Sequence, residues 1–194
     1  GIVPTFARWA DFQAGSEIEP EEKPQINLEL DKITDYVFQI LQTSNFNQEI
    51  HEAFMDLAIG TGVMLVEEGD AINPIKFSSI PLTRVCLNNG PDGVIDTVYR
   101  TRYCKPDEIN ILYPKAVLPE NFDPLRQTKK IKIVEAVYKI YEPNVEKYKL
   151  CVVMEDPKHI LFEETYTGEG ANPYLVFRWN KASGEVYGRG PVFN

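Results

Sequence analysis

The first quarter of the chain has the apolar spacing of α-helices. Between residues 30 and 41, apolar side chains recur at intervals of three and four. This spacing places one stripe along an amphipathic helix that begins at the favourable N-cap Asn27 and ends near Ser44. Asn45 and Gln48 then form a capping-box pattern ahead of a second apolar stripe, which predicts another helix of about three turns. The short break between the two helices predicts a helical hairpin.

After residue 60 the pattern changes to the β-branched and aromatic segments that are typical of strands. Turn-forming residues separate these segments, and only residues 106–113, with acidic residues in the first turn, predict a further short helix. The pattern predicts an α+β fold class, in which the helical hairpin precedes a mostly antiparallel sheet or partial barrel. The predicted strands are residues 63–69, 75–80, 83–88, 93–104, 130–142, 147–156, 159–166 and 173–180.

Residues 1–24 predict an N-terminal arm followed by an acidic linker, because the apolar stretch GIVPTFARWADFQ gives way to acidic residues and prolines. Residues 25–187 form the predicted α+β domain. The chain starts without a methionine and ends without a polar tail, so we expect an excised piece of a longer protein.

The composition, with 43% hydrophobic and 25% charged residues, is that of an ordinary soluble globular domain. The longest apolar runs are much shorter than the roughly 20 residues that cross a bilayer, so we expect no membrane association. The net charge of −9 disfavours tight, nonspecific binding of nucleic acid by the whole surface. Three cysteines lack C-x-x-C spacing and are interpreted as buried, reduced thiols, namely Cys86, Cys104 and Cys151.

Candidate catalytic and metal sites have little support in the sequence. His51 and His159 have no histidine or cysteine at ligand spacing, so we predict neither a metal site nor a cofactor. There is no G-x-S-x-G elbow, and an enzyme would need an unrecognised site around one of the two histidines. Three G-x-G triplets, at residues 60–62, 168–170 and 188–190, do not continue into a phosphate-binding loop and indicate turns or close packing.

One predicted strand interleaves basic and aromatic residues, as do surfaces that hold single-stranded nucleic acid. In the stretch TVYRTRYCK, alternation places Arg100 and Arg102 on one face and Tyr99, Tyr103 and Lys105 on the other. A solvated face with aromatic cross-strand pairs accounts for the same pattern. A β-rich nucleic-acid-binding module therefore stays open as an alternative function.

The stretch RWNKASGEVYGRGP, at residues 178–191, resembles the R-W-x-x-x-x-G-E-x-Y-G-R-G-P signature of the head-to-tail connecting, or portal, proteins of short-tailed bacteriophages. Residues 41–68 are similar to the helix, SNF, helix, GTG and strand region of this family, residues 80–100 to its strands around a D-G turn, and FARWADF to its early tryptophan segment. The resemblance covers nearly the whole chain. Its main residues are Arg178, Trp179, Gly184, Glu185, Tyr187, Gly188, Arg189, Gly190 and Pro191, with Ser44, Asn45, Phe46, Gly60 and Gly62.

This resemblance implies a structural protein and not an enzyme. Portal proteins form a ring, usually of about twelve copies, at the portal vertex of the capsid in the virion, and they assemble in the host cytoplasm. Double-stranded DNA is packaged and ejected through the central channel of the ring without tight binding. The partners that the resemblance implies are other copies of the chain, the terminase packaging motor, a tail adaptor, and capsid or scaffold proteins.

In portal proteins an α+β wing leads into a long stem helix, and the Y-G-R-G-P turn lies at this passage. The resemblance therefore assigns residues 188–194 to the start of the passage, with the stem helix absent from this chain. We expect Gly188 and Gly190 to permit a sharp turn and Pro191 to begin a following helix. We expect Trp179 and Tyr187 to anchor the turn against the core of the wing.

Overall fold

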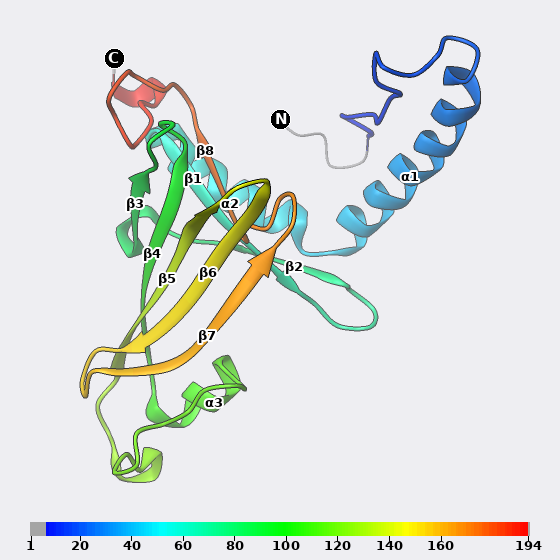
Figure 1. Ribbon diagram of the computed structural model, residues 1–194. Coiled ribbons are helices and arrows are strands. Elements are labelled where there is room, and N and C mark those ends of the chain that lie inside the picture. The colour runs from blue at the N-terminus through cyan, green and yellow to red at the C-terminus, as the bar shows by residue number, and fades with distance from the viewer. Residues whose placement is uncertain (1–6, 194) are drawn as a thin grey trace. The chain divides into compact units, whose positions relative to one another are not determined.

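The computed structural model describes residues 7–193 and confirms the predicted α+β fold class (Figure 1). In these residues two long helices precede eight strands, which form a three-stranded sheet and a five-stranded sheet. Both sheets are open, and neither closes into a barrel. Residues 1–6 of the predicted arm, which include the first residue of the early tryptophan segment, lie outside the described residues, as does Asn194.

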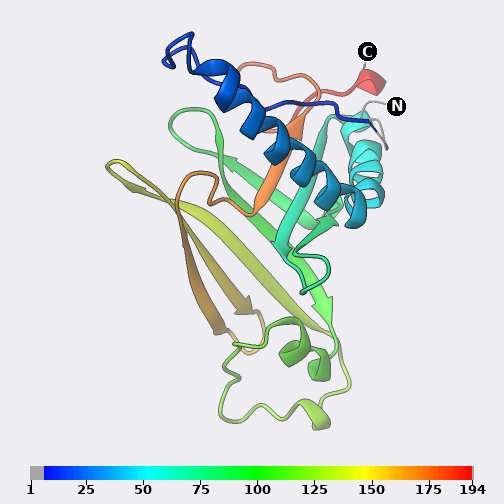
Figure 2. The same ribbon diagram turned by 90° about the vertical axis from the view of Figure 1, so that its right-hand side faces the viewer.

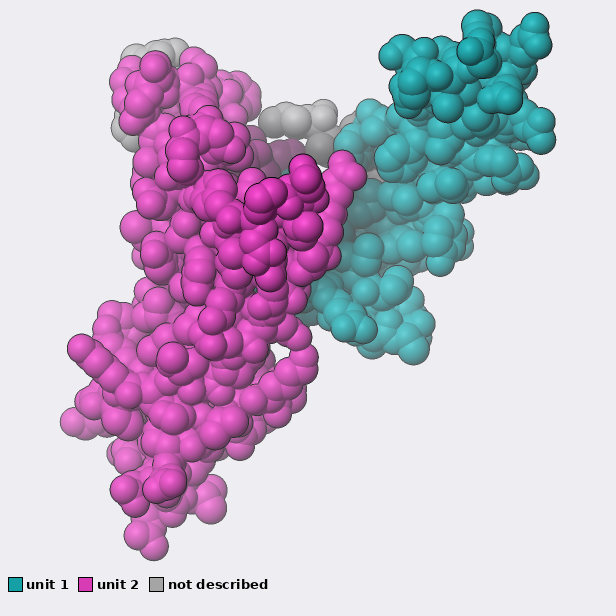
Figure 3. All heavy atoms as spheres, viewed as in Figure 1, with its two compact units in different colours: residues 1–52, 64–79 teal, residues 53–63, 80–194 magenta. Residues whose placement is uncertain are grey.

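The chain consists of two compact units (Figure 3). Unit 1 contains residues 1–52 and 64–79, and unit 2 contains residues 53–63 and 80–194. The division passes within helix α2 (Phe46–Ile59) and strand β1 (Thr61–Glu68), so each of these two elements contributes residues to both units.

Helix α1 (Lys23–Thr43), in unit 1, begins before the predicted N-cap Asn27. Pro24 lies in its first turn, where a proline breaks no intrahelical hydrogen bond and its fixed φ suits the helix. The side chain of Asn27 does not cap the helix, because its Oδ1 accepts a hydrogen bond from the backbone N–H of Ala14 at 2.8 Å. The predicted N-cap is therefore wrong, whereas the predicted end is confirmed by the C-cap Ser44.

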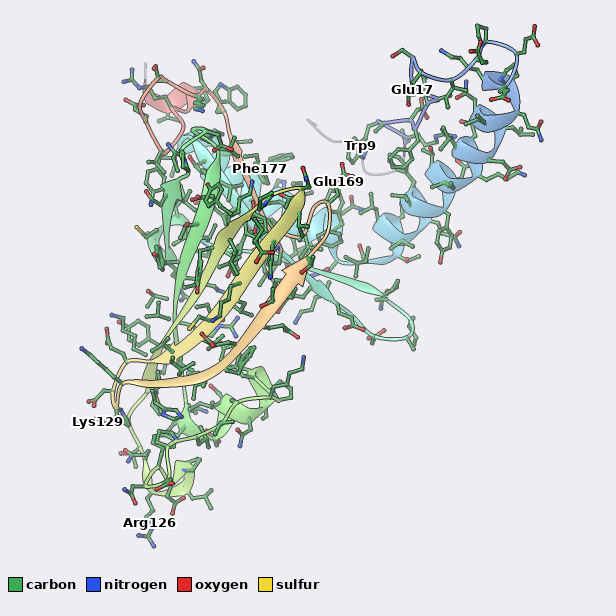
Figure 4. The ribbon with its side chains drawn as sticks, viewed as in Figure 1. Trp9, Glu17, Arg126, Lys129, Glu169 and Phe177 are labelled. Carbon is green, nitrogen blue, oxygen red and sulfur yellow. The ribbon has the colours of Figure 1, made fainter. Side chains whose placement is uncertain are left out.

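The arm packs along α1. The ring of Trp9 meets Phe38 edge-on, with ring centroids 5.4 Å apart (Figure 4), and the N–H of Phe12 donates to Oγ1 of Thr34 at 3.2 Å. Thr34 and Phe38, which lie under the arm, are the buried residues of α1. The residues of the predicted apolar stripe are less buried than these two. Arg8 fixes the arm to the helix through ion pairs with Asp31 and Asp35, and it also pairs with Asp11 within the arm.

Strand β1 pairs antiparallel with β2 (Ile75–Ser79), in a register that sets Met64 opposite Ser79 and Glu68 opposite Ile75. The first five residues of β1 are buried and its last two are exposed, which confirms the predicted strand that enters the core and ends in an acidic turn. With β8 (Tyr174–Arg178), these strands form the sheet of order β2-β1-β8.

The five-stranded sheet lies in unit 2, and strands that are consecutive in the sequence pair antiparallel with one another. Val98 lies opposite Val137, which in turn lies opposite Leu150, so the registers align apolar residues on one face. The strands are β3 (Val85–Asn89), β4 (Ile95–Cys104), β5 (Ile131–Glu142), β6 (Val145–Met154) and β7 (His159–Thr167).

One hydrophobic core cluster of unit 2 lies between this apolar face and the segment that joins β4 to β5. The segment runs at the lower end of the sheet in Figure 2. The segment contains a 3₁₀-helix (Pro106–Glu108) and helix α3 (Ile109–Leu112), which together confirm the predicted short helix. Two further 3₁₀-helices, Leu82–Arg84 and Pro124–Arg126, are not predicted by the sequence pattern. The buried members of this core are Cys104, Ile109, Tyr113, Ile131, Ile133, Val152, Met154 and Leu161.

One carboxylate interrupts the apolar face. Glu135 on β5 is only 6% exposed. Its oxygens lie 3.3 Å from Nη1 of Arg100 and 3.9 Å from Nε of Arg102. The hydroxyl groups of Tyr113 and Tyr174 both donate to the same carboxylate, the latter at 3.2 Å. Burial, followed by the charge of Glu135, raises the pKa of both tyrosines above the ordinary value of 10.0, so they stay protonated donors.

We expect Glu135→Gln to lower the free energy of unfolding by about 3–5 kcal/mol, because it leaves a buried guanidinium without its counter-charge. Glu142→Gln removes a carboxylate of the same strand that pairs with Lys147 at 2.9 Å on the surface, and it should cost less than about 1 kcal/mol. Urea denaturation followed by circular dichroism measures both. Equal losses for the two variants would show that the buried cluster does not stabilise the sheet.

Candidate functional site

Two glycine motifs that lie far apart in the sequence meet in unit 2. The backbone N–H of Gly188 donates to Oγ1 of Thr61 at 2.8 Å, and the N–H of Gly190 donates to the carbonyl of Ile59 at 3.0 Å. We call this contact, with Gly60, Gly62, Gly188 and Gly190 as its glycines, the glycine junction. It joins the turn between α2 and β1 to the segment that follows β8.

Close backbone approach explains why these positions are glycines. A Cβ atom on Gly60 would overlap the carbonyl oxygen of Gly188, and a Cβ on Gly188 would overlap that of Gly60. A Cβ on Gly190 would overlap the carbonyl oxygen of Ala58. Gly188 and Gly190 do not have a positive φ, so their requirement for glycine comes from packing and not from the turn conformation that the sequence predicts.

Gly62, the fourth glycine of the junction, lies against a side chain and not only against backbone. A Cβ on Gly62 would overlap the ring of Phe177, which meets Phe54 edge-on with centroids 6.3 Å apart. Phe177 belongs to β8 and Phe54 to α2. The glycine therefore allows the aromatic side chain to lie directly against the first residues of β1.

The loop between Trp179 and Gly190 is held by its own hydrogen bonds. Nη1 of Arg178 donates to the carbonyl of Val186 at 3.1 Å, and the N–H of Arg189 donates to the carbonyl of Asn180 at 2.8 Å. Nε of Arg189 donates to Glu185 at 3.0 Å, which lowers the pKa of that carboxyl. Gly184 has φ +79°, a left-handed conformation that glycine adopts without strain. Arg178, Gly184, Glu185 and Arg189 thus serve the loop itself.

The aromatic residues of the motif are more exposed than predicted. Trp179 is 51% exposed, so its predicted role as an anchor in the core is wrong. The N–H of Trp179 donates to the carbonyl of Gly60 at 2.9 Å, so its backbone is held at the glycine junction while half of its side chain is exposed. The hydroxyl of Tyr187 accepts a hydrogen bond from the N–H of Leu87 at 3.1 Å, so Tyr187 anchors the turn to the outer edge of β3. Pro191 begins a 3₁₀-helix of three residues, and the expected following helix stays a prediction.

The SNF motif, in unit 1, closes the edge of β2. Nδ2 of Asn45 donates to the carbonyl of Phe77 at 2.7 Å, and the N–H of Phe77 donates to Oδ1 of Asn45 at 3.0 Å. The predicted capping box is therefore not formed, because the side chain of Asn45 pairs with a strand instead. Oγ of Ser44 accepts from the N–H of Phe46 at 3.2 Å, and the ring of Phe46 meets that of Phe77 with centroids 5.1 Å apart. The N–H of Ser79 donates to Glu49 at 2.6 Å.

The candidate nucleic-acid residues of β4 are divided between the two faces of the sheet. Arg100 and Arg102 lie on the core face and pair with Glu135. Tyr99 and Tyr103 are exposed on the opposite face, and Lys105 is exposed just beyond the strand. The two arginines are thus committed to a buried carboxylate, and only the remaining three residues are left for the predicted contact.

Cysteines and histidines form no reactive cluster in the described residues. Cys104 is buried, and its burial raises the pKa of the thiol, but Cys86 is exposed. The predicted burial is wrong for Cys86 because its register with Tyr99 places it on the exposed face. His51 is exposed on α2, and Nε2 of His159 lies 2.9 Å from the carbonyl of Val117. Residues 7–193 contain no group of three His, Cys, Asp or Glu that could hold a metal ion.

The sequence pattern missed the partners of the motif residues. Thr61 stands between two of the glycines, and its hydroxyl accepts the hydrogen bond from Gly188, but nothing in the local pattern indicates this partner. Glu135 has a signal in the sequence, since it is the one charged position in an alternate row that otherwise reads Ile131, Ile133 and Val137. Such a row marks a buried face, and a buried carboxylate needs partners.

Comparison with known protein families gives a match. The family model described as bacteriophage head to tail connecting protein matches residues 1–194, which is the whole chain. A search of curated proteins finds no match. No described helix is long and apolar enough to cross a membrane.

We expect Gly188→Ala to lower the free energy of unfolding by more than about 3 kcal/mol, because the added methyl group meets backbone atoms that cannot move aside. Gly184→Ala is the matched control in the same loop. Its Cβ would have no neighbour within 4 Å, so its cost is limited to the left-handed φ, about 1–2 kcal/mol. Thermal and urea unfolding compare the two. If Gly188→Ala is no worse than the control, close packing is not the reason for the glycine.

We expect Trp179→Ala to cost less than about 1.5 kcal/mol, since half of the side chain is already exposed. Tyr148→Ala provides the comparison, because Tyr148 is a buried aromatic of the same unit and its truncation should cost about 3–5 kcal/mol. Urea unfolding measures both variants. A loss of about 3 kcal/mol or more for Trp179→Ala would mean that its ring stabilises the fold from the surface.

Proposed function

We propose that this chain, which belongs to the bacteriophage head to tail connecting protein family, is a subunit of a closed ring at the portal vertex of the capsid. The observation that carries the proposal is the family match over all 194 residues. The family is one of structural proteins that link the head of the virion to its tail. A closed ring suits this task, because cyclic symmetry leaves a central channel and gives the ring two different faces, one for the head and one for the tail.

In this function the glycine junction holds the segment that follows β8 against the turn between α2 and β1. Three segments converge on it, namely the end of α2, the start of β1 and the loop after β8. The backbone contacts leave no space for side chains, so the path from Trp179 to Pro191 is fixed against the rest of unit 2. A subunit that must transmit the docking of a packaging motor and of a tail adaptor needs such a rigid connection.

The surface charge supports a conduit through which double-stranded DNA passes without tight binding. Each basic side chain that pairs with a phosphate adds affinity that sliding DNA must overcome. On the five-stranded sheet, three lysines pair with neighbouring carboxylates instead, at 2.7–2.9 Å. These are Lys132 with Glu155, Lys147 with Glu142, and Lys149 with Glu163. Together with the net charge of −9, these pairs reduce the number of free cations that could hold DNA.

We expect the natural full-length protein to form a closed ring of about twelve copies. Light scattering coupled to size-exclusion chromatography gives the mass of the particle, and class averages from electron microscopy give its rotational symmetry. The 194-residue chain is measured beside it, which separates assembly by this region from assembly by any other part. A full-length protein that stays monomeric over a range of salt and protein concentrations would contradict the ring.

A further inference from the structure

The net negative charge of the protein comes from unit 1. Residues 1–52 and 64–79 contain thirteen acidic and four basic residues, a formal charge of −9, whereas the rest of the chain contains sixteen of each. Like charges concentrated on one unit disfavour contact between two copies of that unit and favour contact with a basic partner.

Helix α1 in this unit carries an apolar stripe that no described segment of unit 1 fully covers. The stripe follows the helical spacing over 14 residues, or about 21 Å at 1.5 Å per residue. Its members are Ile26, Leu30, Ile33, Val37 and Ile40. Ile33 is 51% exposed and the other four are partly buried. The arm lies on the neighbouring face of the helix, over Thr34 and Phe38 (Figure 4).

Acidic residues border this stripe. A hollow of about 370 Å³ along the first half of α1 is lined by Ile26 and Leu30, which are partly buried, and by Glu22, Gln25 and Glu29, which are exposed. The hollow thus has an apolar floor and an acidic rim, on which Glu29 also forms an exposed ion pair with Lys32 at 2.8 Å. We call the five stripe residues, with Glu22 and Glu29, the α1 face.

We propose that the α1 face binds a basic amphipathic helix of a partner protein. Apolar side chains spaced by three and four residues on the partner would enter the hollow, and flanking lysines or arginines would meet the two glutamates. A second copy of this chain does not fit this description, because its own unit 1 has the same negative charge and its unit 2 has none in net. Nucleic acid is repelled by the same field. The inference concerns unit 1 and stands whether or not the chain forms a ring.

A labelled peptide of about 18 residues tests this proposal, with leucine at helical spacing on one face and lysine on the other. Fluorescence anisotropy with the whole chain should show saturable binding that weakens at high salt. Ile33→Ser should weaken binding by about tenfold, because it removes the most exposed part of the apolar stripe. Glu22→Gln combined with Glu29→Gln should weaken it by about threefold to tenfold.

Matched controls separate this face from charge alone. Ile72→Ser removes an isoleucine of the same unit that is 85% exposed in a loop, and Glu67→Gln combined with Glu68→Gln removes the same charge from the end of β1. Both should leave the affinity within about twofold. A peptide of the same composition with its leucines out of helical register, and one with glutamate in place of lysine, should bind at least about tenfold more weakly.

Three outcomes would overturn the proposal. The out-of-register peptide could bind as tightly as the amphipathic one, the controls could lose as much affinity as the α1 variants, or Ile33→Ser could abolish a self-association of the chain seen by light scattering. The last result would make a second copy the occupant. None of these results bears on the mass of the full-length particle, so a failure here is distinguishable from a failure of the ring.

Discussion

The contact of backbone with backbone at the glycine junction is the constraint on which the rest of unit 2 depends. Gly60 and Gly188 each occupy the space that a Cβ of the other would need, although 128 positions separate them in the sequence. Such a contact has no side chain that could adjust, so it fixes the distance between the turn after α2 and the loop after β8. Because Thr61 and Ile59 supply the acceptors, the backbone N–H groups at this approach are also satisfied.

The carboxylate of Glu135 gives the same unit a second fixed point. Tyr174, at the start of β8, donates to it, and the loop that leaves β8 ends in the glycine junction. Strand β8 is therefore held at both ends by polar groups, while its aromatic Phe177 packs in between. Two arginines and two tyrosines around one buried carboxylate satisfy its oxygens and offset much of the desolvation of its charge. The cluster lies on the five-stranded sheet, and through Tyr174 it also holds the strand that leads into the loop of residues 179–190.

The sequence predicts elements well and their partners poorly. All eight strands and the short helix before Tyr113 follow from local pattern, because alternation and turn residues act over a few positions. The start of α1 does not, since the prolines and acidic residues before Asn27 predict a linker, whereas Pro24 lies in the first turn of the helix. The sequence has no local signal for the exposure of Trp179 or for its backbone hydrogen bond to Gly60, which lies in the turn between α2 and β1. The sequence marks the glycines as turns or close-packing points, but the backbone atoms that Gly188 and Gly190 approach are seen only in the fold.

Side chains and a loop block parts of three sheet edges and so limit pairing with strands of other chains. An open edge presents free backbone groups that pair with any other strand. Here the side chain of Asn45 occupies both groups of Phe77 on β2, and the hydroxyl of Tyr187 occupies an N–H on β3. On β7 the carbonyl of Leu161 accepts from a neighbouring loop. Two of these three blocks come from residues of the family motifs, Asn45 and Tyr187. Where a side chain closes a sheet edge, another protein cannot bind there by strand pairing. Binding then depends on side-chain surfaces, whose shape and charge can select the partner.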